Sequence, residues 1–393
     1  MNSVQTLFPD SVKTKLTKLR RDIHRNPELS FKEEETAFRL ESELKDFGAL
    51  DVRRIAGTGV VARIRGHNRK APIVALRGDI DALPIQEETG LEFASTNAGV
   101  MHACGHDIHA SWIVGAAYLL SRNPAQGDVL VLLQPAEETG KGALAVLESG
   151  ALSRVTAIFG GHVDRRYPVG KVIAQEGPLA ASSDEFYIDL LGRGAHGARP
   201  HEAADPIVGA GALISALQTI VSRRLNPAIP AVVTVGSIHA GTAPNVIPDH
   251  ALLSGTIRAV DPKTRQQLIE EVQRITDFEA KAHGLVGRIR IEEGTPPIVN
   301  PREAVLWARS AVSAVLGDDS FSSLESTNLA AEDFAFYMEK MTGCFLRIGA
   351  REENGPFIPA HSSRFYAAEE TLFIGAAVFA ETARQASASL ASR

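Results

Sequence analysis

The sequence predicts an α/β protein in which a layered domain with a mostly parallel sheet is interrupted by a ferredoxin-like α+β domain. At 393 residues the chain is too long for one ordinary core. Its first and last parts alternate short β-rich runs with helical runs, which is typical of a parallel sheet layered with helices. Between residues 183 and 293 the order changes to β-α-β-β-α-β, which is that of a ferredoxin-like unit.

The first part of the layered domain covers residues 1–182. Residues 11–47 predict helical structure with a break at Asn26-Pro27 and a stop at Gly48. Runs rich in β-branched residues then alternate with runs in which apolar residues recur at helical spacing. They predict strands over 60–66, 72–79, 128–134 and 156–163, and helices over about 107–122 and 141–149.

The segment 183–293 predicts a domain inserted into the first one, because its elements can surround a core of their own. Its expected strands are 184–194, 231–241, 250–260 and 287–294, and its expected helices are 204–224 and 262–284. The chain then returns to the layered domain over 294–393. This last part predicts a helix over 302–316, a strand over 344–350 and a final helix over 365–385.

Composition excludes several classes of protein. Hydrophobic residues make up 44% of the chain and charged residues 22%, as in soluble globular proteins. The net charge is −6 and the basic residues are scattered, which argues against nucleic acid as a partner. Cys104 and Cys344 are too few for a disulfide framework. Without a signal-like N-terminus or an apolar run near the ~20 residues that cross a bilayer, we expect a cytoplasmic protein with no membrane partner.

The stretch MHACGHDIHA, residues 101–110, holds three of the twelve histidines and one of the two cysteines. Its Ala and Gly residues offer little apolar bulk, so packing explains it poorly. Cys104 and His106 immediately precede a predicted helix and have the spacing of metal ligands. The alternative for Cys104 is a small buried thiol. His102 and His109 are equally consistent with a supporting or a purely structural role.

Further candidates follow the strands of the layered domain, where open α/β sheets place their sites. Asp79 and Asp81 follow one strand, the pair Glu137-Glu138 follows another, and His162 ends a third. The strand 344–350 leads through a polar loop to His361. Alone, His162 would fit a core histidine and His361 a loop residue, while the two aspartates could support ligating imidazoles or cap the next segment. The convergence of these segments is what predicts a site.

The types of ligand narrow the choice of metal. Thiolate, imidazole and carboxylate together suit zinc, manganese, cobalt or nickel better than magnesium or calcium. One ion bound to five protein ligands would have no room for substrate. Two ions about 3.5–4 Å apart could share the five and each keep a position open for a bridging water. The five candidates are Cys104, His106, Glu138, His162 and His361.

The adjacent carboxylates Glu137 and Glu138 would ordinarily indicate a solvated turn or a helix N-terminus. Beside two cations, one carboxylate can bind metal while the other accepts a proton from the bridging water. That carboxylate could later pass the proton to a leaving amine. Spacing does not settle which glutamate has which role.

Eight motifs of this chain together resemble the M20 metallopeptidase family. The similarity covers nearly the whole sequence and is greatest to the aminoacylase-like branch, which includes hippurate hydrolase and auxin-conjugate hydrolases. The motifs are RDIHRNPELSFKEEET (21–36), LRGDIDALP (76–84), HACGHD (102–107), QPAEETGKGA (134–143), GGHV (160–163), GRGAHGARPH (192–201), GTAPNVIP (241–248) and HSSRF (361–365).

The resemblance implies a dinuclear catalytic domain interrupted by a lid domain that usually forms a homodimer. It implies Glu137 as the general base and a histidine, His196, that polarises the scissile carbonyl, often in the partner's site. Asn245 and Arg258 would hold the end of the substrate, Arg258 through its carboxylate. From the residues alone, these lid positions would be a strand-to-helix connection and an exposed strand residue. The family's metal ligands fall on Cys104, His106, Glu138, His162 and His361.

The expected function is therefore metal-dependent hydrolysis of N-acyl amino acids, with acetyl, benzoyl or indole-acetyl groups, to a carboxylate and a free amino acid. Gly177-Pro178 and the loop 292–300 would serve as hinges of the lid. Members of the family often have proline where this chain has Ser363, and we expect the loop backbone to adapt. The alternatives are a dipeptidase or aminopeptidase with the same site, and a metal-binding scaffold without turnover, against which the intact pair Glu137-Glu138 argues.

Overall fold

A computed structural model describes residues 2–324 and 329–393, which form two compact units. Unit 1 comprises Met1–Gly177, Asn300–Glu325 and Asp333–Arg393, and unit 2 comprises Pro178–Val299 and Ser326–Glu332. Each unit has a hydrophobic core of its own. The chain thus leaves unit 1 five residues before the boundary expected at 182/183 and returns six residues after the one expected at 293/294.

Unit 1 is built on a seven-stranded sheet of order β1-β2-β4-β3-β5-β15-β6. The four central strands are mutually parallel, and the outer strands pair antiparallel. This confirms the mostly parallel sheet. The sequence analysis missed the edge strand β1, whose side chains are half exposed, and ended β5 too early. The bounds are β1 (Leu50–Ile55), β2 (Gly59–Ile64), β3 (Ile73–Asp79), β4 (Val129–Gln134), β5 (Val155–Pro168), β6 (Val172–Ile173) and β15 (Thr342–Arg351).

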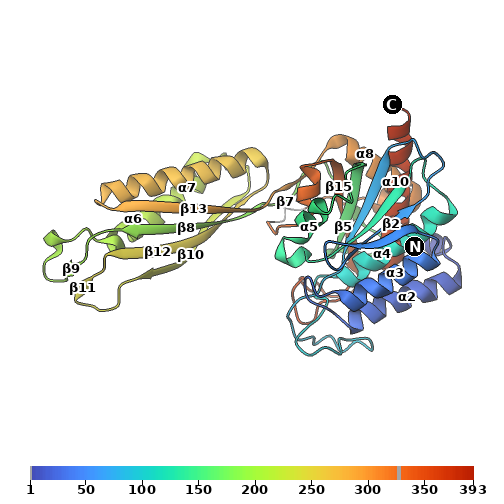
Figure 1. The fold of residues 1–393 in the computed structure, drawn as a ribbon, viewed down its shortest axis with the longest axis horizontal. Helices are drawn as coiled ribbons and strands as arrows, with labels where there is room; N and C mark the ends of the chain where they lie inside the picture. Colours follow the sequence, from blue (N-terminus) through green and yellow to red (C-terminus); the bar gives the residue numbers. More distant parts are fainter. Residues whose placement is uncertain (1, 325–328) are drawn as a thin grey trace. The chain divides into compact units, whose positions relative to one another are not determined.

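Two long helices of unit 1, α4 and α10, pack side by side against the sheet (Figure 1). Both are apolar on nearly every side, which is why they are buried almost throughout. Helices α2 and α3 in turn cover α4, and α8 packs beside α10. The bounds are α1 (Asn2–Gln5), α2 (Asp10–Arg25), α3 (Glu34–Asp46), α4 (His106–Arg122), α5 (Gly142–Glu148), α8 (Arg302–Leu316), α9 (Ala335–Met338), α10 (Glu370–Ala391), and the short η1 (Glu137–Thr139) and η4 (Asp318–Ser320).

Unit 2 has the element order β-α-β-β-α-β around an antiparallel sheet of order β10-β12-β8-β13. Both helices pack on one face of the sheet, where alternate residues of β8 such as Phe186 and Ile188 are buried (Figure 1). The bounds are β8 (Ser183–Leu191), α6 (Pro206–Thr219), β10 (Ala231–Ala240), β12 (His250–Ala259), α7 (Pro262–Ala282) and β13 (Val286–Thr295).

Short elements complete the described chain. The strand β9 (Ala195–His196) pairs with β11 (Val246–Ile247), and β7 (Gly177–Ala180) pairs with β14 (Ile298–Asn300). A 3₁₀ turn, η2 (Pro200–Glu202), precedes α6, and a π-helical turn, η3 (Ile220–Arg224), follows it. Asp205 caps α6 by accepting from the backbone N–H of Ile207.

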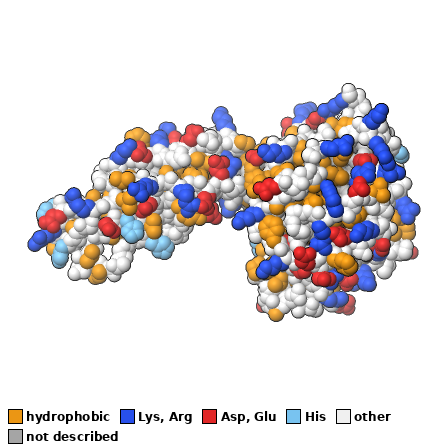
Figure 2. All heavy atoms as spheres, in the orientation of Figure 1, with side chains coloured by type: hydrophobic (Ala, Val, Ile, Leu, Met, Phe, Trp, Pro, Cys, Tyr) orange, Lys and Arg blue, Asp and Glu red, His pale blue; other side chains and the backbone are white. Residues whose placement is uncertain are grey.

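One described stretch, Pro206–Arg224, is long and apolar enough to cross a membrane by length and composition alone. This corrects the expectation that no apolar run approaches that length. In unit 2 one side of the stretch is buried against the sheet, as in the core helix of a globular domain. Figure 2 shows Lys and Arg mixed with Asp and Glu over the visible face, in keeping with the scattered charges of the sequence.

Candidate metal centre and active site

The candidate residues of unit 1 gather where its parallel strands end. Asp79 and Gln134, the last residues of β3 and β4, are direct neighbours in the sheet. The turn η1 follows β4 and carries Glu137 and Glu138, while His162 lies within β5. The loop after β15 brings in His361.

Unusual backbone conformations present several of these side chains. Gly105, between Cys104 and His106, has a φ of +91°, and a Cβ there would lie 2.5 Å from the side chain of Val163. Ala136, just before η1, has a φ of +53°, and His361 one of +65°. Non-glycine residues in this left-handed region are often held there at functional sites.

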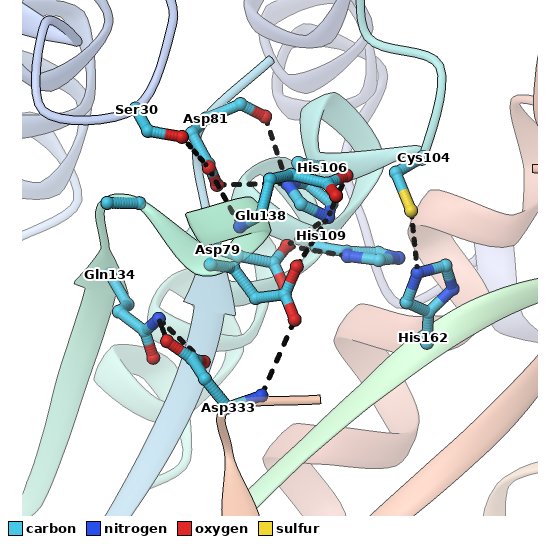
Figure 3. Close-up of polar contacts among 12 residues, drawn as sticks. Ser30, Asp79, Asp81, Cys104, His106, His109, Gln134, Glu138, His162 and Asp333 are labelled. Carbon is cyan, nitrogen blue, oxygen red and sulfur yellow. Dashed lines mark hydrogen bonds and ion pairs between the residues drawn. The ribbon is translucent and has the colours of Figure 1, made fainter. Parts of the chain in front are cut away.

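The five candidate ligands lie together. Sγ of Cys104 is 3.2 Å from Nε2 of His162, and the two side chains point toward each other (Figure 3). Nε2 of His361 is 3.5 Å from Oε2 of Glu138. Two groups of possible ligand atoms include the Cys104 thiol, and within each group the atoms lie within 4.8 Å of one another. The groups are Cys104–His106–His162 and Cys104–Glu138–His361. This arrangement offers two adjacent positions for cations around one sulfur atom.

Hydrogen bonds orient two of the imidazoles for metal binding. Nδ1 of His106 lies 2.9 Å from the backbone oxygen of Asp81, and Nδ1 of His162 lies 2.7 Å from that of Val163. Since a carbonyl only accepts, both Nδ1 atoms must donate, so each Nε2 offers a lone pair to a cation when its ring is neutral. Nε2 of His106 and Oε1 of Glu138 are buried and have no hydrogen-bond partner among the residues that the structure describes. Such orphaned atoms fit a bound cation.

The Asp81 carboxylate connects three parts of the site. Its Oδ1 is 3.2 Å from Nδ1 of His106, and its Oδ2 accepts hydrogen bonds from the Ser30 hydroxyl and the Glu138 backbone N–H. Of the two roles left open for Asp81, the structure therefore shows the contact with an imidazole. The Asp81 carboxylate therefore fixes the positions of the His106 ring and of the turn that carries Glu138 relative to each other.

Asp79 has a different imidazole partner, His109. The distance from Oδ1 of Asp79 to Nδ1 of His109 is 2.6 Å. Nε2 of His109 accepts a hydrogen bond from the backbone N–H of Val163. Burial lowers the pKa of His109, so the ring is neutral and supports the strand that carries His162. Burial would raise the pKa of Asp79, but the charges of His106 and Arg77 hold it well below its usual range. His102 has no hydrogen-bond partner on either ring nitrogen among the described residues.

The sequence analysis missed a buried polar network beneath the site. Arg77 contacts Asp79, donates to Oε1 of Gln134 and binds Oδ1 of Asp333 at 2.8 Å. Asp333 also accepts from Gln134 and from the backbone N–H of Ala143. Arg77 on an otherwise apolar buried strand was the available signal, because a buried guanidinium requires carboxylate or carbonyl partners.

The charge distribution of the site is acidic. Burial raises the pKa of the Cys104 thiol well above its ordinary value, and the negative charge of Glu138 adds to the effect. Burial lowers the pKa of His162 well below its ordinary value. A cation at the site would favour the thiolate and stabilise the surrounding carboxylates.

Glu137 lies beside the five candidate ligands. Its Oε2 is 3.9 Å from Nε2 of His106, and its Oε1 is 3.4 Å from the backbone nitrogen of Asp333. Glu137, Glu138 and His106 together form a further group of possible ligand atoms within 4.8 Å. A half-buried carboxylate in this position can exchange protons with a molecule held at the site.

The candidate residues of unit 2 lie in two separate places. His196 ends β9 opposite Val246, next to Asn245, whose backbone oxygen accepts the N–H of Gly197. A hollow of about 620 Å³ adjoins His196. Arg258 pairs with Val232 at the other end of β12, eight residues beyond His250. His250 lines the same hollow as His196, and the eight strand residues from His250 to Arg258 span about 26 Å, so one copy of unit 2 does not bring Arg258 to His196.

A mostly parallel α/β sheet with candidate thiol, imidazole and carboxylate ligands at its strand ends is typical of a metal-dependent hydrolase. The chain belongs to peptidase family M20/M25/M40, whose family model matches residues 75–385.

Three relatives illustrate the similarity. An N-acetylcysteine deacetylase of Bacillus subtilis is 41% identical over 94% of this chain and 96% of its own. An IAA-amino acid hydrolase of Arabidopsis thaliana is 38% identical over 94% of this chain and 84% of its own. A crystal structure described as a dinuclear metal-binding peptidase of the M20 family, from B. subtilis, superposes with a TM-score of 0.84 at 36% identity and covers 96% of this chain and 98% of its own.

Proposed function

We propose that this protein hydrolyses the amide bond of N-acyl amino acids with two divalent metal ions, which could be zinc, manganese, cobalt or nickel. The observation that carries the proposal is the pair of ligand groups that share the Cys104 thiol. The names of the deacetylase and the IAA-amino acid hydrolase support the class of substrate. Both cysteines are free thiols, which suits a reducing compartment such as the cytoplasm.

Two ions bound by Cys104, His106, Glu138, His162 and His361 would lower the pKa of water and polarise the amide carbonyl. Glu137 is the only member of the acidic pair left outside this proposed ligand set, so it accepts the proton of the attacking water. The same carboxylate then donates that proton to the departing nitrogen. His196 donates a hydrogen bond to the carbonyl oxygen as negative charge develops there.

The placement of the unit 2 residues supports a homodimer. Arg258 lies eight residues, or about 26 Å, along β12 from His250, which lines the same hollow as His196, and this is too far for a small substrate to touch both ends. A dimer would solve this, with Arg258 binding the substrate carboxylate in its own subunit. His196 and Asn245 would then serve the site of the partner. Unit 2 would act as the lid and the dimerisation domain, hinged near Gly177-Pro178 and the loop 292–300.

Metal analysis combined with a release assay tests the proposal. The purified protein should contain two divalent ions per chain and release free amino acid from acetyl, benzoyl or indole-acetyl amino acids. Unblocked dipeptides are the comparison substrates. Faster cleavage of dipeptides than of every acylated amino acid would favour a dipeptidase or aminopeptidase instead. Absence of metal and of turnover with all substrates would leave only a non-catalytic role.

A further inference from the structure

The loop that carries His361, residues 352–369, contains no helix or strand. Most residues from 352 to 361 are exposed, and the His361 side chain is itself 53% exposed. With a φ of +65°, His361 adopts a conformation that costs free energy for a residue with a Cβ. Such a conformation persists only when the surroundings fix it, so the loop requires an anchor.

That anchor is the side chain of Arg165, which lies in β5 three residues after His162 and is 1% exposed. Its Nη1 donates to the backbone oxygen of Tyr366 at 2.9 Å, and its Nη2 donates to that of Pro356 at 2.9 Å. Nη2 also binds Oε2 of Glu352 at 3.1 Å. The guanidinium lies 4.3 Å from the centroid of the Tyr366 ring.

The partners of Arg165 bracket His361 along the chain. Glu352 and Pro356 precede it, and Tyr366 follows it. The planar guanidinium can donate in two directions at once, whereas a lysine ammonium is a point charge with no fixed fork. A single buried side chain thus joins residues on both sides of His361 to the strand that supplies another candidate ligand, His162.

We propose that Arg165 is a positioning residue that holds the loop 351–366 so that His361 reaches the metal site. This inference rests on the proposed function, because His361 is a ligand only if the site binds metal. Arg165 would act on His361 alone, since the orientation of His162 depends on the Val163 carbonyl.

The loop has two further contacts with the site region. The backbone N–H of His361 donates to Ala103, next to Cys104, and Ser363 exchanges two hydrogen bonds with Glu88. These contacts tie the middle of the loop, and backbone hydrogen bonds from Val169 to Arg351 and from Ala368 to Ala350 close its base. Loss of the Arg165 contacts would therefore free the segments on either side of His361, weaken the Cys104–Glu138–His361 group and leave Cys104–His106–His162 in place.

The test compares full-length Arg165→Met, which keeps the apolar stem, with Arg165→Lys, which keeps the charge. Arg63→Met is the matched control, because Arg63 also lies on a strand of unit 1 and binds two carboxylates, Asp51 and Asp128. Manganese binding is measured by titration against a chelator. Hydrogen exchange of residues 351–366 is measured separately on the metal-free proteins.

We expect Arg165→Met to bind one of its two ions about 10–100-fold more weakly than the parent, with the other unchanged. Exchange should accelerate in residues 351–366, Arg165→Lys should resemble Arg165→Met, and Arg63→Met should match the parent. Parent-like binding of both ions, or equal weakening of both, would overturn the inference. A parent that binds no manganese would contradict the proposed function instead, while hydrogen exchange would still show whether Arg165 anchors the loop.

Discussion

Cys104 and His162 lie 58 residues apart in the sequence, yet Sγ of one is 3.2 Å from Nε2 of the other. The contact follows from the topology, because α4 begins just after Cys104 and β5 passes beside β3 in the centre of the sheet. His361 and Glu138 reach the same place from two other segments. The proposed metal centre therefore exists only in the folded sheet.

Asp81 should control metal affinity without touching a metal. Its carboxylate contacts His106 and the backbone of Glu138, so Asp81→Asn would loosen two proposed ligands together. We expect binding of divalent ions to weaken about 10–100-fold. Isothermal titration measures the affinity, with Ser30→Ala as a milder change at the same carboxylate. Unaltered affinity in Asp81→Asn would show that the hydrogen bond of the Asp81 carbonyl alone orients His106.

Glu137→Gln should separate metal binding from turnover. The glutamine amide cannot accept a proton, so kcat should fall by about 10²–10⁴-fold while both ions stay bound. Steady-state kinetics and metal analysis on the same sample measure the two effects. Glu148→Gln is the control, because Glu148 is exposed and lies outside the candidate site. A rate near that of the parent in Glu137→Gln would assign the proton transfer to another group.

His24 should make the stability of unit 1 depend on pH. It is buried between Asp107, at 2.9 Å from Nδ1, and Glu87, at 3.2 Å from Nε2. Burial lowers its pKa, but Asp107 and Glu87 outweigh burial and the neighbouring charge of Arg20, so the pKa is raised overall. The stabilisation that protonated His24 gives the folded state is therefore complete below the pKa of about 6.5 that His24 has in the unfolded chain. It is lost as the pH rises through the higher pKa of His24 in the folded state.

His24→Gln should lower the free energy of unfolding by about 3 kcal/mol at pH 6 and by less as the pH rises. Urea denaturation followed by tryptophan fluorescence reports on unit 1, because both tryptophans, Trp112 and Trp307, lie there. The exposed His67→Gln should stay within about 0.5 kcal/mol of the parent. A difference between His24→Gln and the parent that does not change with pH would mean that His24 is neutral when folded.

His196 should act on the partner's site. Glu137→Gln and His196→Ala should each have little activity alone. If equal amounts are dissociated and mixed, half of the dimers are hybrids with one intact site, so about a quarter of the parent activity should return. Activity after mixing is the measurement, and unmixed variants taken through the same steps are the controls. No recovery, with hybrid formation verified, would place His196 in its own subunit's site.

The mostly parallel sheet and the proximity of the candidate ligands could be predicted, because both follow from the order of strands and helices along the chain. Strand ends in a parallel sheet meet at one edge, so His162 and Glu138 could be expected to lie close together from their positions alone. The topology of unit 2 was predictable for the same reason. Its extent was less so, because the short strands β7 and β14 carry few residues with a periodic pattern.

Contacts that depend on tertiary packing could not be predicted. Arg165 follows His162 in the sequence, but its partners lie some 200 residues away in an irregular loop. Asp333 reaches Arg77 from a segment with no regular structure of its own. The hydroxyl and the carbonyl of Ser363 both bind Glu88, whereas proline at this position could bind it only through its carbonyl.

An anomalous-difference map from crystals grown with zinc or manganese would show whether two cations share the Cys104 thiol. We predict two peaks about 3.5–4 Å apart, one beside His106 and His162 and the other beside Glu138 and His361. A map with no peak near Cys104, or with a single peak away from it, would contradict the account.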